Sequence, residues 1–173
     1  MTLRAKVLTV SDSVSTGERV DSAGPALTTR LSDAGYDVVE QRLVADGVES
    51  VSTALRELAS GFAGLIVTTG GTGFAPRDLT PEATLSVIER EAPGLGEVMR
   101  ATSPFGALSR ARCGTLGASL IINTPGSPTG ALECLESVLG LCAHALNLLS
   151  GTSDSHPPET GGTTAISSEG PTT

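Results

Sequence analysis

The feature that most constrains the fold of this 173-residue chain is a fourfold repetition of a short apolar segment, a loop and a helical pattern. The apolar segments are short and rich in β-branched residues, which is typical of buried parallel strands. They cover residues 7–10, 38–44, 65–69 and 119–123. Because parallel strands need crossover helices, this order predicts an α/β domain whose mostly parallel sheet is covered by helices on both faces.

Apolar residues at helical spacing follow each predicted strand. Asp21 or Ser22 is the expected cap of the first helix, and Thr80 and Pro81 are the expected N-cap and first residue of the third. Between residues 93 and 116, glycine and proline interrupt short apolar groups, so we expect a short helix and loops there, with a minor hairpin as an option. The predicted helices cover residues 22–35, 48–61, 80–90 and 132–149.

Composition predicts one domain, residues 1–150, followed by a polar tail. Apolar residues make up 39% of the chain, with three Phe, one Tyr and no Trp, so the core must be aliphatic and aromatic platforms for nucleic acid are not expected. Residues 151–173 are rich in Gly, Ser, Thr and Pro and contain too little apolar surface to offset the entropy of ordering. We expect that tail to be disordered.

The charge and the cysteine content of the chain indicate which partners it can bind and in which compartment it lies. The formal charge is −8, from 19 acids and 11 bases, which opposes binding to nucleic acid or to an anionic membrane. No apolar stretch approaches the ~20 residues of a membrane span, and the N-terminal apolar run is too short for a signal peptide. The three cysteines form no CxxC pair and are expected to be reduced, so we expect a cytoplasmic protein.

The loops that follow the predicted strands are the places to search for chemistry, because ligands of an open parallel sheet bind beyond the carboxyl ends of its strands. Those loops carry an unusual density of polar residues and glycine. They contain Ser11 and Asp12, then Asp46, then Gly70 through Asp78, and finally Pro125, Gly126 and Ser127.

The run TTGGTGFAPRDLTPEAT at residues 68–84 is the most informative part of the chain. The N–H groups of residues 71–73 could converge on an anion, although the run lacks the patterns of a P-loop and of a dinucleotide fingerprint. Asp78 would repel a phosphate unless a divalent cation such as Mg²⁺ lay between them. A tight turn with a helix cap would explain Gly70 and Thr80, but not three glycines, an arginine and an aspartate together.

Other residues at this edge have two interpretations each. Asp46 could be a helix cap or a second carboxylate for a metal ion, and Ser11 and Asp12 could be turn formers or ligand contacts. Asn123, with the Pro-Gly-Ser run that follows it, could form a rigid turn or present amides to a ligand. Arg110 could bind an anion or lie solvated on the surface.

These residues resemble the MogA/MoaB family, which shares its fold with the G domains of gephyrin and of the plant Cnx proteins. The similarity extends from residue 5 to about 150. It consists of four segments in the family's order: SDSVSTGERVDSAGP at 11–25, the glycine-rich run at 68–84, Leu-Ser-Arg at 108–110 and INTPGSP at 122–128.

The resemblance implies a three-layer α/β/α sandwich that assembles as a homotrimer. It also implies an enzyme of molybdenum cofactor biosynthesis that attaches AMP from Mg-ATP to the terminal phosphate of molybdopterin and releases pyrophosphate. A downstream molybdenum insertase is the natural partner. The alternative is a paralogue of the MoaB type that binds molybdopterin or acts as a scaffold without catalysing the transfer.

The family's functional residues match positions of this chain. Two family carboxylates needed for adenylyl transfer match Asp46 and Asp78, which the resemblance makes both catalytic residues and Mg²⁺ ligands. One departure is Ser13, where family members often carry arginine. The expected nucleotide and pterin contacts are Ser11, Asp12, Gly70, Gly71, Thr72, Gly73, Thr80, Ser109, Arg110, Asn123, Pro125, Gly126 and Ser127, of which the Ser-Arg and Pro-Gly loops are the pterin side.

Overall fold

A computed structural model describes residues 3–151, so the predicted tail lies outside the described residues from residue 152 onward. The strands are β1 (Arg4–Val10), β2 (Asp37–Val44), β3 (Gly64–Thr69), β4 (Arg90–Glu91), β5 (Cys113–Leu116) and β6 (Ser119–Thr124). The helices are α1 (Asp12–Ser15), α2 (Ala23–Asp33), α3 (Val48–Ala59), α4 (Thr80–Leu85), α5 (Pro93–Arg100), the 3₁₀ helix η1 (Pro104–Leu108) and α6 (Pro128–Leu149).

The six strands form one sheet in the order β2-β1-β3-β6-β5-β4. Strands β2, β1, β3 and β6 are parallel, and they are the four strands that the sequence predicts. Strand β5 pairs antiparallel with β6, so the hairpin extends beyond residues 93–116, where a minor hairpin was expected, and β4 pairs antiparallel with β5. The α/β fold class with a mostly parallel sheet is therefore confirmed.

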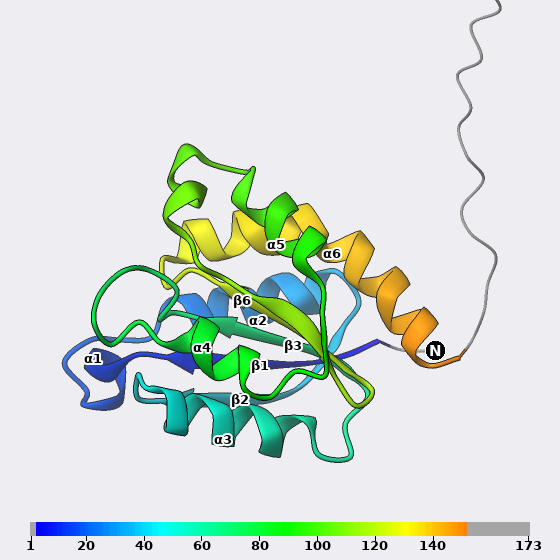
Figure 1. Ribbon diagram of the computed structural model, residues 1–173, viewed down its shortest axis with the longest axis horizontal. Coiled ribbons are helices and arrows are strands. Elements are labelled where there is room, and N and C mark those ends of the chain that lie inside the picture. Colours follow the sequence, from blue (N-terminus) through cyan, green and yellow to red (C-terminus); the bar gives the residue numbers. More distant parts are fainter. Residues whose placement is uncertain (1–2, 152–173) are drawn as a thin grey trace, which may run out of the picture.

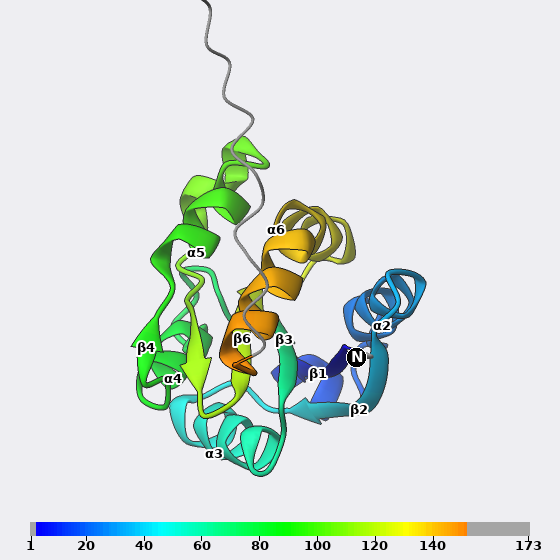
Figure 2. The same cartoon turned by 90° about the vertical axis from the view of Figure 1, so that its right-hand side faces the viewer.

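Two apolar layers cover the sheet, one on each face. Helices α2, α5 and α6 pack on one face, where Leu27, Leu135 and Val67 belong to one core cluster. Helices α3 and α4 pack on the other, where Leu55 and Ile66 belong to a second cluster. Figure 1 shows α5 and α6 above the sheet and α3 below it, and Figure 2 shows the same separation from the side. This arrangement is the three-layer sandwich that the resemblance implies.

Helix α4 is shorter than predicted, and its start is different. It ends at Leu85 instead of continuing to about Arg90. The chain leaves the helix because Arg90 joins β4, opposite Thr115 of β5, so pairing in the sheet replaces further helical bonds. Leu79 occupies the N-cap position, and Thr80 lies inside the first turn. The prediction that Thr80 caps the helix is therefore wrong.

Helix α2 is capped by a residue that the sequence singled out. The backbone N–H of Gly24 donates to Asp21 Oδ1 at 2.9 Å, whereas the side chain of Ser22 makes no capping bond. Thr9 in β1 donates to the other oxygen of Asp21 at 2.6 Å. The cap therefore also fixes the start of α2 against the sheet.

Helix α6 corrects the expectation about apolar stretches. Its 22 residues are long and apolar enough to cross a membrane by length and composition alone. Five of its side chains are buried against the sheet and its neighbours: Ala131, Leu135, Val138, Cys142 and Leu146. The core helix of a protein that spans no membrane passes the same test, so the length and composition of α6 are weak evidence for a membrane span.

Candidate active site

The four parallel strands bring their following loops to one edge of the sheet, at the left of Figure 1. In the strand register, Val10 lies beside Val44, and Thr69 lies beside Thr124. Gly70 follows β3 with φ of 102°, and a Cβ atom there would collide with the carbonyl oxygen of Val10. Only glycine allows the chain to turn so close to the neighbouring strand.

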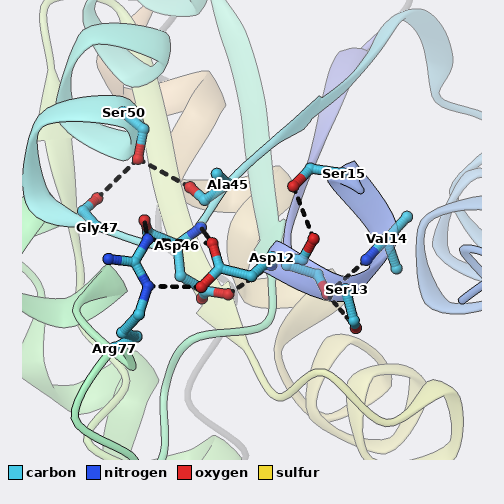
Figure 3. A network of polar contacts seen from close by, with 10 residues as sticks. Asp12, Ser13, Val14, Ser15, Ala45, Asp46, Gly47, Ser50 and Arg77 are labelled. Carbon is cyan, nitrogen blue, oxygen red and sulfur yellow. Dashed lines mark hydrogen bonds and ion pairs between the residues drawn. The ribbon is translucent and has the colours of Figure 1, made fainter. Parts of the chain in front are cut away.

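Asp12 and Asp46 hold each other by a reciprocal pair of hydrogen bonds (Figure 3). The N–H of Asp12 donates to Asp46 Oδ2 at 2.7 Å, and the N–H of Asp46 donates to Asp12 Oδ1 at 3.0 Å. Each carboxylate thus satisfies a backbone donor in the other loop. The pair joins the loops after β1 and β2 and orients the Asp46 side chain.

Arg77 clamps this pair from the glycine-rich loop. Its Nε donates to Asp12 Oδ2 at 2.5 Å, and its Nη2 donates to Asp12 Oδ1 at 3.0 Å and to the carbonyl oxygen of Asp46. Arg77 is not among the site residues that the sequence predicts. No periodicity connects positions 65 residues apart, and the only available signal was an arginine next to Asp78 in an otherwise acidic group of loops.

Thr80 and Asp46 lie close to Gly71, and Asp78 lies close to Gly73. A Cβ on Gly71 would collide with Thr80 Oγ1 and lie 3.0 Å from Asp46 Oδ1, so only glycine lets these two side chains pack so close to the loop. Asp78 accepts a bond from the N–H of Ala75 at 2.9 Å through Oδ2. Thr80 is fully buried, and its hydroxyl has no partner among the described residues.

The two carboxyl groups of the reciprocal pair have opposite pKa shifts. Burial raises the pKa of Asp46, and the charges of Asp12 and Asp78 add to that rise. The hydrogen bond from Arg77 lowers the pKa of Asp12. Arg77 therefore stabilises the charge of Asp12, while the environment of Asp46 disfavours its charge unless a cation offsets it.

The donor set at this position fits Mg²⁺ held together with a nucleotide. Within residues 3–151, no three His, Cys, Asp or Glu side chains form a cluster able to hold a metal by themselves. Asp46 and Asp78 instead both line one hollow and offer carboxylate oxygens there. Mg²⁺ is commonly bound by one or two carboxylates, with phosphate oxygens and water completing the shell.

Three hollows lie at this edge, and two of them have similar volumes. The acidic hollow, about 330 Å³, is lined by Asp21, Asp46 and Asp78 and by the backbone at Gly70 and Gly71. The apolar hollow, about 320 Å³, lies between α5, η1 and the start of α6 and is lined by apolar residues that include Met99, Phe105, Ala111, Pro125 and Cys134. Ser127 lines both hollows, so the loop after β6 separates them.

Comparison with known proteins identifies the family to which this chain belongs. Residues 6–144 match the family described as a probable molybdopterin binding domain. The chain belongs to this molybdopterin-binding family.

Relatives of this family member match most of its length. The molybdopterin adenylyltransferase of Helicobacter pylori J99 is 40% identical over 157 residues, which cover 87% of this chain and 89% of that protein. The molybdopterin adenylyltransferase of Escherichia coli K12 is 41% identical over 144 residues, covering 79% and 74%. The crystal structure of the molybdopterin biosynthesis enzyme MoaB from Thermus thermophilus superposes with a TM-score of 0.82 at 45% identity, covering 86% of this chain and 97% of that one.

Two predicted binding residues of this molybdopterin-binding domain bond to protein groups. Arg110 donates to the carbonyl oxygens of Gly73 and Asp78 and to Glu82, so it braces the glycine-rich loop. The buried amide of Asn123 donates to two threonine hydroxyls at 3.0 Å, and its oxygen accepts from the N–H of Arg112. A direct contact of either side chain with a ligand stays a prediction.

The other predicted contacts fall into two groups around the hollows. On the acidic side lie Ser11, which caps α1, and Gly70, Gly71 and Gly126. Gly73, with the buried Thr72, lines a shallower depression that runs from Asp78 to Ser109. On the apolar side lie Ser109, Asn123 and Pro125, while Ser127 caps α6 between the two hollows.

Proposed function

We propose that this chain is a molybdopterin adenylyltransferase, which uses ATP and Mg²⁺ to form adenylyl-molybdopterin and pyrophosphate. The observation that carries this proposal is the arrangement of Asp46 and Asp78 on an acidic hollow that shares Ser127 with an apolar one. The names of two relatives about 40% identical over most of the chain support the same reaction. The acidic hollow suits the metal-bound phosphates, and the apolar hollow suits the flat pterin ring.

The main obstacle to this reaction is charge, because both the donor and the acceptor are anions. An oxygen of the terminal phosphate of molybdopterin forms a bond to the α-phosphorus of ATP, and the bond from that phosphorus to the β-phosphate oxygen breaks. Pyrophosphate leaves with the electron pair. When bound, Mg²⁺ supplies charge neutralisation and aligns the phosphates.

The residues of the chain contribute position and contact. Asp46 and Asp78, which both line the acidic hollow, would hold the cation. Gly71 and Gly73 allow the loop to pass close to Thr80 and Asp78, since a Cβ on either glycine would collide with an oxygen of those side chains. The phosphate of molybdopterin serves as the nucleophile, so the reaction needs no covalent intermediate on the protein.

The proposal extends to a homotrimer in the cytoplasm that passes its product to a molybdenum insertase. Its cytoplasmic part is supported by the cysteines: the three thiols are free in the structure, and burial raises the pKa of Cys113 and of Cys142 to about 12. The trimer follows from the family resemblance. Light scattering of the purified chain at micromolar concentration tests it, and a monomer would contradict it.

Label transfer tests the proposed reaction. Purified protein, molybdopterin, Mg²⁺ and ATP labelled at the α-phosphate should give one labelled adenylyl group on molybdopterin for each pyrophosphate released. The same mixture with EDTA should give none. Tight molybdopterin binding without label transfer would instead favour the non-catalytic MoaB-type paralogue.

A further inference from the structure

Arg77 joins the loops after β1, β2 and β3, which are three of the four loops that line the acidic hollow. It belongs to the loop after β3, and its guanidinium binds the carboxylate of Asp12 after β1 and the carbonyl oxygen of Asp46 after β2 (Figure 3). Asp78, one of the two proposed metal ligands, is the next residue in the chain. The side chain of Arg77 thus connects the backbone next to Asp78 with the backbone carbonyl of Asp46.

Stability does not explain this contact. The side chain of Arg77 is 61% exposed and that of Asp12 is 41% exposed, and ion pairs in such surroundings contribute little to the free energy of folding. The geometry is nevertheless specific, because three bonds from one planar group reach both Asp12 oxygens and the Asp46 carbonyl. A lysine ammonium has the same charge, but it lacks the fixed fork that makes parallel bonds.

Three contacts hold the glycine-rich loop in place. Arg110 holds its inner part, at the carbonyl oxygens of Gly73 and Asp78. The N–H of Thr80 donates to the carbonyl of Gly71 at 3.1 Å and closes the loop at its base. Arg77 supplies the connection from this loop to Asp46.

We propose that Arg77 is a positioning residue, whose fork on Asp12 and on the Asp46 backbone sets the separation of the Asp46 and Asp78 carboxylates. The effect of Arg77 on activity rests on the proposed adenylyl transfer. The effect of Arg77 on the structure of the apo protein does not depend on that function. Without the fork, the reciprocal pair of Asp12 and Asp46 loses one partner, and the loop carrying Asp78 is no longer fixed to it.

The test compares Arg77→Lys and Arg77→Met with Arg30→Met. Arg30 forms an exposed ion pair with Glu136 at 3.0 Å and lies in α2, so it controls for the loss of a surface arginine. The first readout is amide hydrogen exchange in the apo protein at Asp12 and Asp46, whose N–H groups form the reciprocal bonds. We expect exchange at both amides to become at least about tenfold faster in both Arg77 variants and to stay unchanged in Arg30→Met.

The second readout is the Mg²⁺ dependence of adenylyl transfer at saturating ATP. We expect the half-saturating Mg²⁺ concentration to rise about tenfold in both Arg77 variants, with molybdopterin affinity unchanged. Normal behaviour of Arg77→Lys in both readouts would show that charge alone matters and would overturn the proposal. Faster exchange with an unchanged Mg²⁺ dependence would reduce Arg77 to a structural contact and would also overturn it, as would unchanged exchange in both Arg77 variants.

Failure of the proposed function gives a different result. If the unmutated protein transfers no adenylyl group, the exchange readout still stands, and Mg²⁺-dependent binding of ATP measured by calorimetry replaces the second readout. Weaker Mg²⁺-dependent binding in both Arg77 variants would then support the positioning role. Equal binding in all variants would overturn it.

Discussion

The acidic and apolar hollows are nearly equal in volume, at about 330 and 320 Å³, but they are built in different ways. The acidic hollow is formed by the loops after β1, β2, β3 and β6, and the bonds of Asp12, Asp46 and Arg77 join the first three. The apolar hollow is formed by α5, η1 and α6 and depends on side-chain packing. One edge of the sheet thus offers two kinds of chemistry on either side of Ser127.

This difference favours binding of the two halves of the product, the nucleotide and the pterin, in separate hollows. Carboxylates suit a metal-bound nucleotide, and an apolar wall suits a flat heterocycle. A change in one hollow should therefore affect one ligand and spare the other. Single substitutions in each hollow test that separation.

Asp78→Asn should have the largest effect, because it removes a charge from the metal site. Asparagine keeps an oxygen that can accept from the N–H of Ala75, so the loop should keep its shape. We expect adenylyl transfer to fall by on the order of 10² or more, with little change in molybdopterin affinity. Single-turnover transfer and equilibrium pterin binding at saturating Mg-ATP measure the two quantities.

Asp46→Asn repeats this test on the other proposed ligand and should give the same pattern. Near-normal transfer in both variants would refute the metal role of these carboxylates. An equal loss of pterin affinity and of transfer would instead show that the two hollows are not separable.

Cys134→Phe should give the converse result. Cys134 lines the apolar hollow and is only partly buried, so a phenyl ring there should occupy the space proposed for the pterin. We expect molybdopterin affinity to fall about tenfold or more while Mg²⁺-dependent ATP binding stays unchanged. Cys134→Ala is the matched control, because it removes the thiol and leaves the hollow open. Calorimetry with each ligand separately decides the outcome, and weakened ATP binding in the phenylalanine variant would contradict the separation.

A smaller effect should appear in the melting temperature, which Asp46→Asn and Asp12→Asn should change in different directions. The pKa of Asp46 is raised in the folded state, so its charge costs stability as pH rises through the interval from its unfolded to its folded pKa. The pKa of Asp12 is lowered, so its charge contributes stability that is lost as pH falls through its folded pKa. At neutral pH, Asp46→Asn should therefore raise the melting temperature or leave it unchanged, and Asp12→Asn should lower it by about 1–3 °C.

Thermal melts of both variants at neutral pH and near pH 3 test this difference. The advantage of Asp46→Asn should shrink at the lower pH, because the unmutated carboxyl is then protonated. A marked destabilisation by Asp46→Asn at neutral pH would mean that its charge is already compensated without a cation.

The acidic side was more predictable from the sequence than the apolar side. Parallel strands end at one edge, so the loops after them had to meet, and this places Asp46 and Asp78 together. The apolar hollow joins α5, η1 and α6, and no local pattern announces which of their side chains meet. The Ser-Arg and Pro-Gly segments pointed toward it only through the family resemblance.

The features that the sequence does not predict depend on hydrogen bonds between residues far apart in the chain. The contact between Arg77 and Asp12 spans 65 positions and follows no repeat. Arg110 and Asn123 were candidates for ligand contact, yet each bonds to several protein groups that only the folded chain brings within reach. The early end of α4 has the same origin, because the pairing of β4 with β5 depends on residues 25 positions away.

Ligand mapping by amide hydrogen exchange on the full chain tests the division between the two hollows most directly. With Mg²⁺ and α,β-methylene ATP, which cannot transfer its adenylyl group, protection should appear in the loops after β1, β2 and β3. With molybdopterin alone, it should appear in α5, η1 and the first turn of α6, and adenylyl-molybdopterin should protect both regions. Protection of the same hollow by both separate ligands would contradict the account.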